Sequence, residues 1–156
     1  MRYLVLLFAL ILASCNNSRD GNSSAQTESI PNKSMTLWTD KTELFVEFPA
    51  LVVGSPSRFA AHFTVLDKHR PVREGSVTVS LIKGDKGIRN VVQSPSSPGI
   101  FSPSIIPKEA GNYQLVFDIT TPSYSDKLII HDIIVYPTKE AAISALGDVS
   151  ADSCIS

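Results

Sequence analysis

YQLVFDI, residues 113–119, alternates apolar and polar side chains and so places four apolar residues on one face: Tyr113, Leu115, Phe117 and Ile119. A period of two is typical of a β-strand that buries one face. Similar alternation, or an apolar run of strand length, occurs in residues 43–48, 58–66, 76–83, 88–93 and 128–136. The last run is apolar on both faces, which indicates a strand that is central, bulged or covered. Because turn-forming residues separate these runs, the pattern predicts an all-β domain over residues 35–137.

The turn before this strand suggests which all-β fold to expect. Residues 108–115 (KEAGNYQL) place Gly111 in a turn and Tyr113 at the start of the alternating strand. In a tyrosine corner, which is found in immunoglobulin-type domains, the ring packs into the core and the hydroxyl bonds back to the preceding loop. We therefore expect an immunoglobulin-like antiparallel β-sandwich, with structural roles for Gly111 and Tyr113.

Length and composition exclude several classes of protein. The chain has 156 residues, of which 43% are hydrophobic and 19% charged, a formal net charge of −1 and two cysteines. This length suits one ordinary domain with tails. The near-neutral charge argues against a nucleic-acid binder, the apolar content against a disordered chain and the two cysteines against a disulfide scaffold.

The first residues predict export. Residues 3–12 are uninterruptedly apolar but too few to span a bilayer, so residues 1–14 are interpreted as a signal peptide. Residues 12–15 (LASC) resemble the lipobox of bacterial lipoproteins, which implies that the Cys15 sulfur carries a diacylglycerol. The alternative is an ordinary signal peptide with a chance cysteine. The expected location is the cell envelope, facing the periplasm, with the choice between inner and outer membrane left open.

Two further segments flank the predicted domain. Residues 15–34 contain one large apolar residue, Ile30, and are interpreted as a flexible, lipidated tether. With Cys15 acylated, Cys154 has no intramolecular disulfide partner. Residues 138–156 are interpreted as a short helix, capped by Thr138 and ended by Gly147, that leads into a truncated linker.

The sequence offers few candidates for chemistry. His62 and His131 are the candidate metal ligands, on the hypothesis that they meet across neighbouring strands; the alternative is that they are solvated or core-edge histidines. No serine stands in a G-x-S-x-G elbow, and the turn at residues 84–87 lacks the spacing of a phosphate loop. We therefore expect a protein that is not an enzyme and has no cofactor, a transition metal at the histidines being the one alternative considered.

Several segments resemble a known family. Residues 38–48 (WTDKTELFVEF), 60–64 (AAHFT) and 77–81 (VTVSL), with 99–101 and 110–113, are similar to the N-terminal β-domain of some periplasmic adaptor subunits of resistance-nodulation-division (RND) efflux pumps. These are membrane fusion proteins of the HlyD-like, heavy-metal type. The resemblance implies an inner-membrane RND pump and an outer-membrane channel as partners, and transmembrane efflux of metal ions. A full adaptor also has lipoyl-like and helical-hairpin parts, which this sequence lacks, so either a truncated adaptor or a separate accessory module is expected.

The sequence thus predicts a non-catalytic, lipid-anchored periplasmic module that acts by contact with proteins. The first alternative is a metal- or small-ligand-binding lipoprotein that uses His62 and His131. A third idea, glycan binding, lacks the usual aromatic platform, because Trp38 is the only tryptophan.

Overall fold

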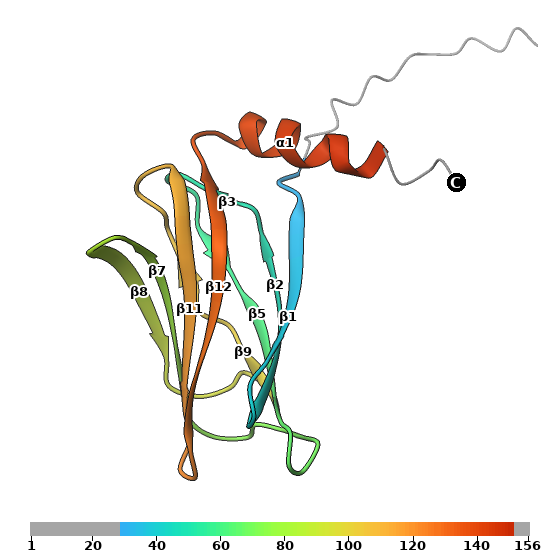
Figure 1. Ribbon diagram of the computed structural model, residues 1–156, viewed down its shortest axis with the longest axis vertical. Coiled ribbons are helices and arrows are strands. Elements are labelled where there is room, and N and C mark those ends of the chain that lie inside the picture. The colour runs from blue at the N-terminus through green and yellow to red at the C-terminus, as the bar shows by residue number, and fades with distance from the viewer. Residues whose placement is uncertain (1–28, 152–156) are drawn as a thin grey trace, which may run out of the picture.

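The structure, a computed structural model, describes residues 29–151, with side chains as far as residue 147. The predicted signal peptide, the lipidation site Cys15 and Cys154 lie outside these residues. Most of the described chain forms β-strands, and one helix follows them (Figure 1). The predicted all-β class is therefore confirmed.

Five strands form the first sheet. Strand β2 (Thr42–Pro49) pairs on one side with β1 (Asn32–Trp38) and on the other with β5 (Ala60–Val65). Strand β5 also pairs with the two short strands β6 (Arg70–Pro71) and β9 (Ile100–Phe101). All these pairings are antiparallel, and β1 is an edge strand.

Five more strands form the second sheet, in the order β3-β12-β11-β7-β8. Their bounds are β3 (Leu51–Val52), β7 (Ser76–Lys83), β8 (Lys86–Val92), β11 (Gly111–Thr120) and β12 (Ser125–Tyr136). The pairing of β3 with β12 is parallel and the others are antiparallel. A separate two-stranded ladder joins β4 (Ser57–Arg58) to β10 (Ser104–Ile105).

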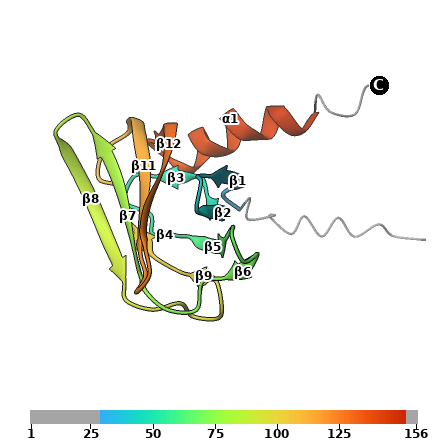
Figure 2. The same cartoon turned by 60° about the horizontal axis from the view of Figure 1, so that its bottom comes forward.

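The two large sheets face each other (Figures 1 and 2). Both contribute buried residues to one apolar core. Alternate residues of β2 and β5 from the first sheet, and of β7 from the second, are buried, and Leu115, Phe117 and Ile119 of β11 belong to the same core. Phe117 of β11 packs edge-on against Phe59 and Phe63, with ring centroids 5.7 and 6.5 Å apart. Burial of such rings is the main favourable term in folding, so the predicted alternation directs the packing of the core.

Three boundaries differ from the predictions. Strand β1 begins at Asn32, so the predicted tether, which ends at Ser34, is too long at its C-terminal end. The predicted strand 58–66 is divided, since Arg58 belongs to β4 and Ala60–Val65 to β5. The helix α1 (Lys139–Ala151) continues through Gly147, where the sequence predicted its end. A glycine inside a helix costs only about 1 kcal/mol, so α1 can continue through Gly147.

Strand β12 contains the irregularity that its two apolar faces suggested. Between Tyr113 and Leu115 of β11, the partner on β12 shifts from Ile133 to Ile130, which leaves an extra residue on β12. Asp132 has a φ of 58°, in the left-handed region. The strand is therefore bulged, and the extra residue keeps Ile130 and Ile133 on the same buried face, whereas Ile129 and Ile134 are exposed on the other.

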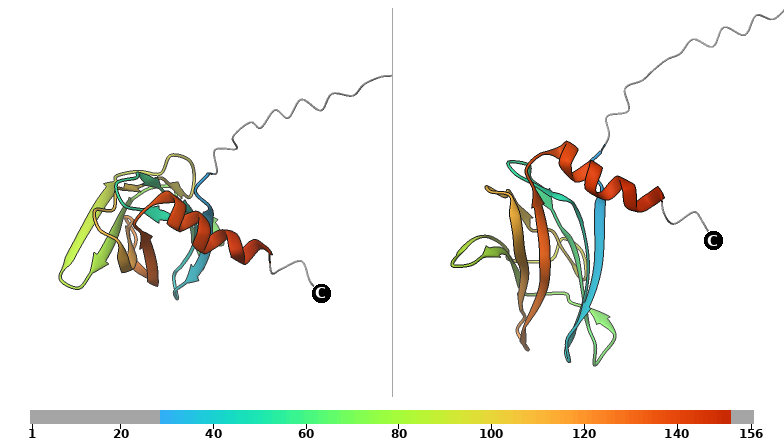
Figure 3. Two further views of the ribbon diagram at one scale, coloured as in Figure 1. Left: turned by 90° about the horizontal axis from the view of Figure 1, so that it is seen from above. Right: turned by 45° about the horizontal axis from the view of Figure 1, so that its top comes forward.

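Helix α1 lies across the end of the domain where β1 begins (Figure 3). The Thr138 hydroxyl accepts a hydrogen bond from the Ala141 amide at 3.2 Å, as expected for a helix N-cap. Ala142 is buried with Ala50, Val52 and Tyr136, and Ile30 packs against the same cluster. Within residues 29–151, no helix has the length and apolarity needed to cross a bilayer.

Candidate functional site

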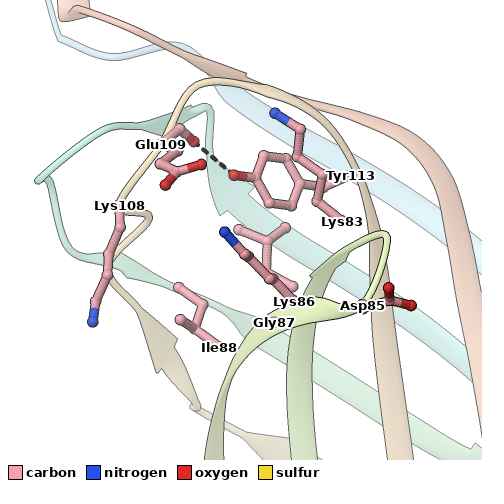
Figure 4. Close-up of a pocket in the computed structure, with 9 residues that line it drawn as sticks. Lys83, Asp85, Lys86, Gly87, Ile88, Lys108, Glu109 and Tyr113 are labelled. Atoms are coloured by element: carbon pink, nitrogen blue, oxygen red, sulfur yellow. Dashed lines mark hydrogen bonds between the residues drawn. The ribbon is translucent and has the colours of Figure 1, made fainter.

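A hollow in the described part of the chain lies between the β7–β8 hairpin and the loop before β11 (Figure 4). Its volume is about 460 Å³. The residues that line it are Leu81, Lys83, Asp85, Lys86, Gly87, Ile88, Lys108, Glu109 and Tyr113.

Tyr113 forms the predicted tyrosine corner at this hollow. Its hydroxyl donates a hydrogen bond to the Glu109 backbone carbonyl at 2.9 Å, and its ring packs against the core. Burial, and then the negative charge of Glu109, raise the pKa of Tyr113 above its ordinary value of 10.0. The phenol therefore stays protonated at neutral pH and acts as a hydrogen-bond donor that holds the loop.

Lys83 of β7 contacts the same corner. Its Nζ donates to the Ala110 carbonyl at 3.1 Å and lies 5.4 Å from the centre of the Tyr113 ring. Gly111 has a φ of 138°, and a Cβ at this position would stand 2.5 Å from the Lys83 Nζ. Gly111 therefore has the structural role expected from the sequence, because a side chain would strain the backbone and displace Lys83.

The main polar groups of this hollow hold the corner together. The hydroxyl of Tyr113 and the ammonium of Lys83 are both engaged with backbone carbonyls. The other charged groups, on Asp85, Lys86, Lys108 and Glu109, include both signs and belong to exposed residues, where charges interact weakly.

The two candidate metal ligands do not meet. His62 lies on β5 in the first sheet, where its ring is 5.7 Å from that of Phe45. His131 lies on β12 in the second sheet, with its Nδ1 3.4 Å from Nε2 of Gln114. The expectation that they face each other across neighbouring strands is wrong, because β5 and β12 belong to different sheets. No group of three or more His, Cys, Asp or Glu residues suited to a metal occurs among the described residues.

The outer face of the first sheet gathers a different set of residues. The strand register forms three rows across it: Ser34–Glu47–Ala60, Thr36–Phe45–His62–Ile100 and Trp38–Glu43–Thr64. Their neighbours along each strand point into the core, so these side chains face outward. We call Trp38, Glu43, Phe45, Glu47 and His62 the acidic aromatic face.

Sequence reasoning missed this face. In residues 43–48, Leu44, Val46 and Phe48 point inward, so Phe45 is an apolar residue on the polar side, between two glutamates. The apolar Phe45 on the polar side of this strand was the one signal in the sequence that could have indicated the face. The sequence could not show that the neighbours of Phe45 are Thr36 and His62, because register between strands is set by the fold.

No protein-family model, curated protein or solved structure matches the chain. The functional argument therefore depends on the residues and geometry described above, and the resemblance to RND adaptors remains a prediction.

Proposed function

We propose that this chain is a non-catalytic, lipid-anchored module of the bacterial cell envelope that works by contact with other proteins. Its role would be that of the N-terminal domain of a periplasmic adaptor in an RND efflux system, of the HlyD-like, heavy-metal type. Its partners would be the inner-membrane pump and the outer-membrane channel, and the exported substrate would include metal ions.

The observation that carries this proposal is the position of the chain entry. Ile30, just before β1, packs against the cluster that contains Ala142 of α1, so the N-terminal entry and the helix share one end of the domain (Figures 1 and 3). The β1–β2 and β11–β12 hairpins meet at the opposite end, where Thr39 is bonded to Asp126. A lipid at Cys15 would stand at most about 50 Å of extended chain from Ile30. An anchored domain would then turn its helix end toward the membrane and its hairpin end toward partners.

The fold that we propose is an immunoglobulin-like β-sandwich. Two five-stranded sheets that share one apolar core support it. The Tyr113–Glu109 hydrogen bond supports it as well, because a tyrosine corner is typical of that architecture.

Metabolic labelling tests the anchor. We expect the full chain, expressed in a Gram-negative bacterium, to incorporate a palmitate analogue and to fractionate with membranes. Cys15→Ser should abolish both, whereas Cys154→Ser, the matched control, should change neither. An unlabelled, cytosolic protein would contradict the proposal.

Crosslinking tests the partners. We expect an RND pump or its outer-membrane channel among the proteins crosslinked to the anchored chain in cells. A chain that is labelled but crosslinks to neither would contradict the adaptor assignment while leaving the anchor intact.

A further inference from the structure

We infer that the acidic aromatic face binds an extended, arginine- and lysine-bearing segment of a partner protein. This inference rests on the protein-contact role proposed above and specifies the chemistry of the partner.

The aromatic part of the face spans three strands. Phe45 on β2 lies opposite His62 on β5, with ring centroids 5.7 Å apart and planes tilted by 51°. Trp38 on β1 pairs with Glu43, one step diagonally from Phe45, and Trp38 is 65% exposed. Diagonal neighbours on a sheet are within reach of one bound side chain. Trp38 and Phe45 therefore offer aromatic surface to one ligand.

The charged part of the face is negative. Glu43 and Glu47 stand on either side of Phe45 along β2, on the same outward face. Neither makes an ion pair with a described residue, and the three rows contain no lysine or arginine. Arg58 lies at one end, where it lines a shallow hollow with Glu47 and Ala60. The carboxylates nearest Trp38 and Phe45 are thus available to a cation from outside.

A guanidinium or ammonium group can interact with both the aromatic rings and the carboxylates of this face. It stacks on the faces of Trp and Phe rings, and it pairs with carboxylates, which guanidinium can do through two hydrogen bonds. A neutral sugar would use the ring of Trp38 but gain no charge–charge attraction from Glu43 and Glu47. Charge complementarity therefore favours a basic segment over a glycan.

The sheet edge beside Trp38 favours an extended conformation for that segment. Among the described strands, β1 pairs only with β2, so the other edge of Asn32–Trp38 has unpaired backbone groups. An added strand would continue the sheet, and every second side chain of it would lie on the face that carries Ser34, Thr36 and Trp38. An alternating basic sequence would then place its cations in one row beside Trp38.

Fluorescence provides a direct test, because Trp38 is the only tryptophan of the chain. The full-length protein in detergent is titrated with three peptides as long as β1, in which threonine alternates with arginine, glutamine or glutamate. We expect the arginine peptide alone to change Trp38 emission in a saturable way, and added salt to weaken its binding. Equal responses to the arginine and glutamine peptides, or no response to any of them, would overturn the inference.

Substitutions assign the effect to the face. Glu43→Gln with Glu47→Gln, and separately Phe45→Leu, should each weaken the arginine peptide by about tenfold. Glu109→Gln, an exposed glutamate of the Tyr113 corner, is the matched control and should leave the affinity unchanged. The thermal unfolding midpoint of each variant should equal that of the wild type, so that a loss of affinity is not a loss of folding. Equal losses in the control and the test variants would contradict the site.

Further measurements distinguish a basic segment from other ligands of this face, and distinguish a failure of this inference from a failure of the proposed function. Trp38 emission that responds to oligosaccharides instead of the arginine peptide, or sedimentation showing self-association through this face, would overturn the inference in favour of a glycan or a second copy. If the arginine peptide does not bind but Cys15 is labelled in cells, this inference is contradicted and the proposed function is not. If the arginine peptide binds but the protein is unlabelled in cells, the proposed function is contradicted and this inference is not.

Discussion

The Thr39 hydroxyl donates a hydrogen bond of 2.5 Å to Oδ2 of Asp126, a residue 87 positions away in the chain. This bond joins the β1–β2 hairpin of the first sheet to the β11–β12 hairpin of the second. Beside it, the buried Thr42 donates to the Tyr124 hydroxyl at 3.3 Å. The two sheets are thus linked by polar bonds at the end of the domain opposite α1.

Removal of this link should destabilise the domain. Thr39→Val deletes the donor to Asp126 and the acceptor for the Lys41 and Thr42 amides. We expect a loss of about 1–2 kcal/mol in the free energy of unfolding, measured by urea denaturation. Thr36→Val, on the exposed face of the neighbouring strand β1, is the control and should cost little. Equal effects of the two substitutions would contradict the role of the link.

The same link should make stability depend on acid pH. Partial burial acts to raise the pKa of Asp126, but hydrogen bonds from the Thr39 hydroxyl and the Lys127 amide, with the charge of Lys41, outweigh it and lower the pKa below 3.8. A lowered pKa in the folded state stabilises the protein above the ordinary pKa, and this contribution is lost as pH falls through the folded value.

Urea denaturation at several pH values measures this contribution. The difference in unfolding free energy between the wild type and Asp126→Asn should be largest near neutral pH and should shrink below about pH 4. A difference that stays constant across this range would rule out the charged form of Asp126 as its source.

Tyr113→Phe should weaken the corner without disturbing its packing. The substitution removes only the hydroxyl that donates to Glu109, so we expect a loss of about 1 kcal/mol in thermal or urea unfolding. Tyr136→Phe, which removes the hydroxyl of another largely buried tyrosine, is the control and should cost less. A larger loss in the control would contradict the importance of the corner bond.

Gly75 should tolerate a side chain less well than Gly54. Gly75 has a φ of 123°, and a Cβ there would lie 2.3 Å from the Thr120 carbonyl oxygen. Gly54 has a φ of 74° and open space around it. We expect Gly54→Ala to cost about 1 kcal/mol and Gly75→Ala more than about 2 kcal/mol in unfolding experiments. The opposite ranking would contradict the close backbone contact.

Thr138 should control fraying at the start of α1. Thr138→Ala removes the acceptor for the Ala141 amide, and we expect the first turn to lose about 1 kcal/mol. Hydrogen exchange at the Ala141 and Ala142 amides should become faster by a factor that matches this loss. Thr138→Ser keeps the acceptor and should preserve the protection. Faster exchange in both variants would point to a role of the methyl group instead.

Local signals in the sequence predicted the strands, the corner and the helix start. Alternation in residues 113–119 predicts a strand because a period of two places one face in the core, and β11 covers these residues. The Gly111–Tyr113 turn and the Thr138 cap were also predictable, since each depends on residues a few positions apart. The helix end was not, because Gly147 costs too little to stop α1.

Only the tertiary structure decided which strands became neighbours. It placed His62 and His131 in different sheets, brought Phe45 beside His62, and joined Thr39 to Asp126. A strand's own residues set which of its faces is buried, by their pattern alone. The identity and register of its partner depend on how two sheets pack their side chains across the core, which involves residues far apart in the chain.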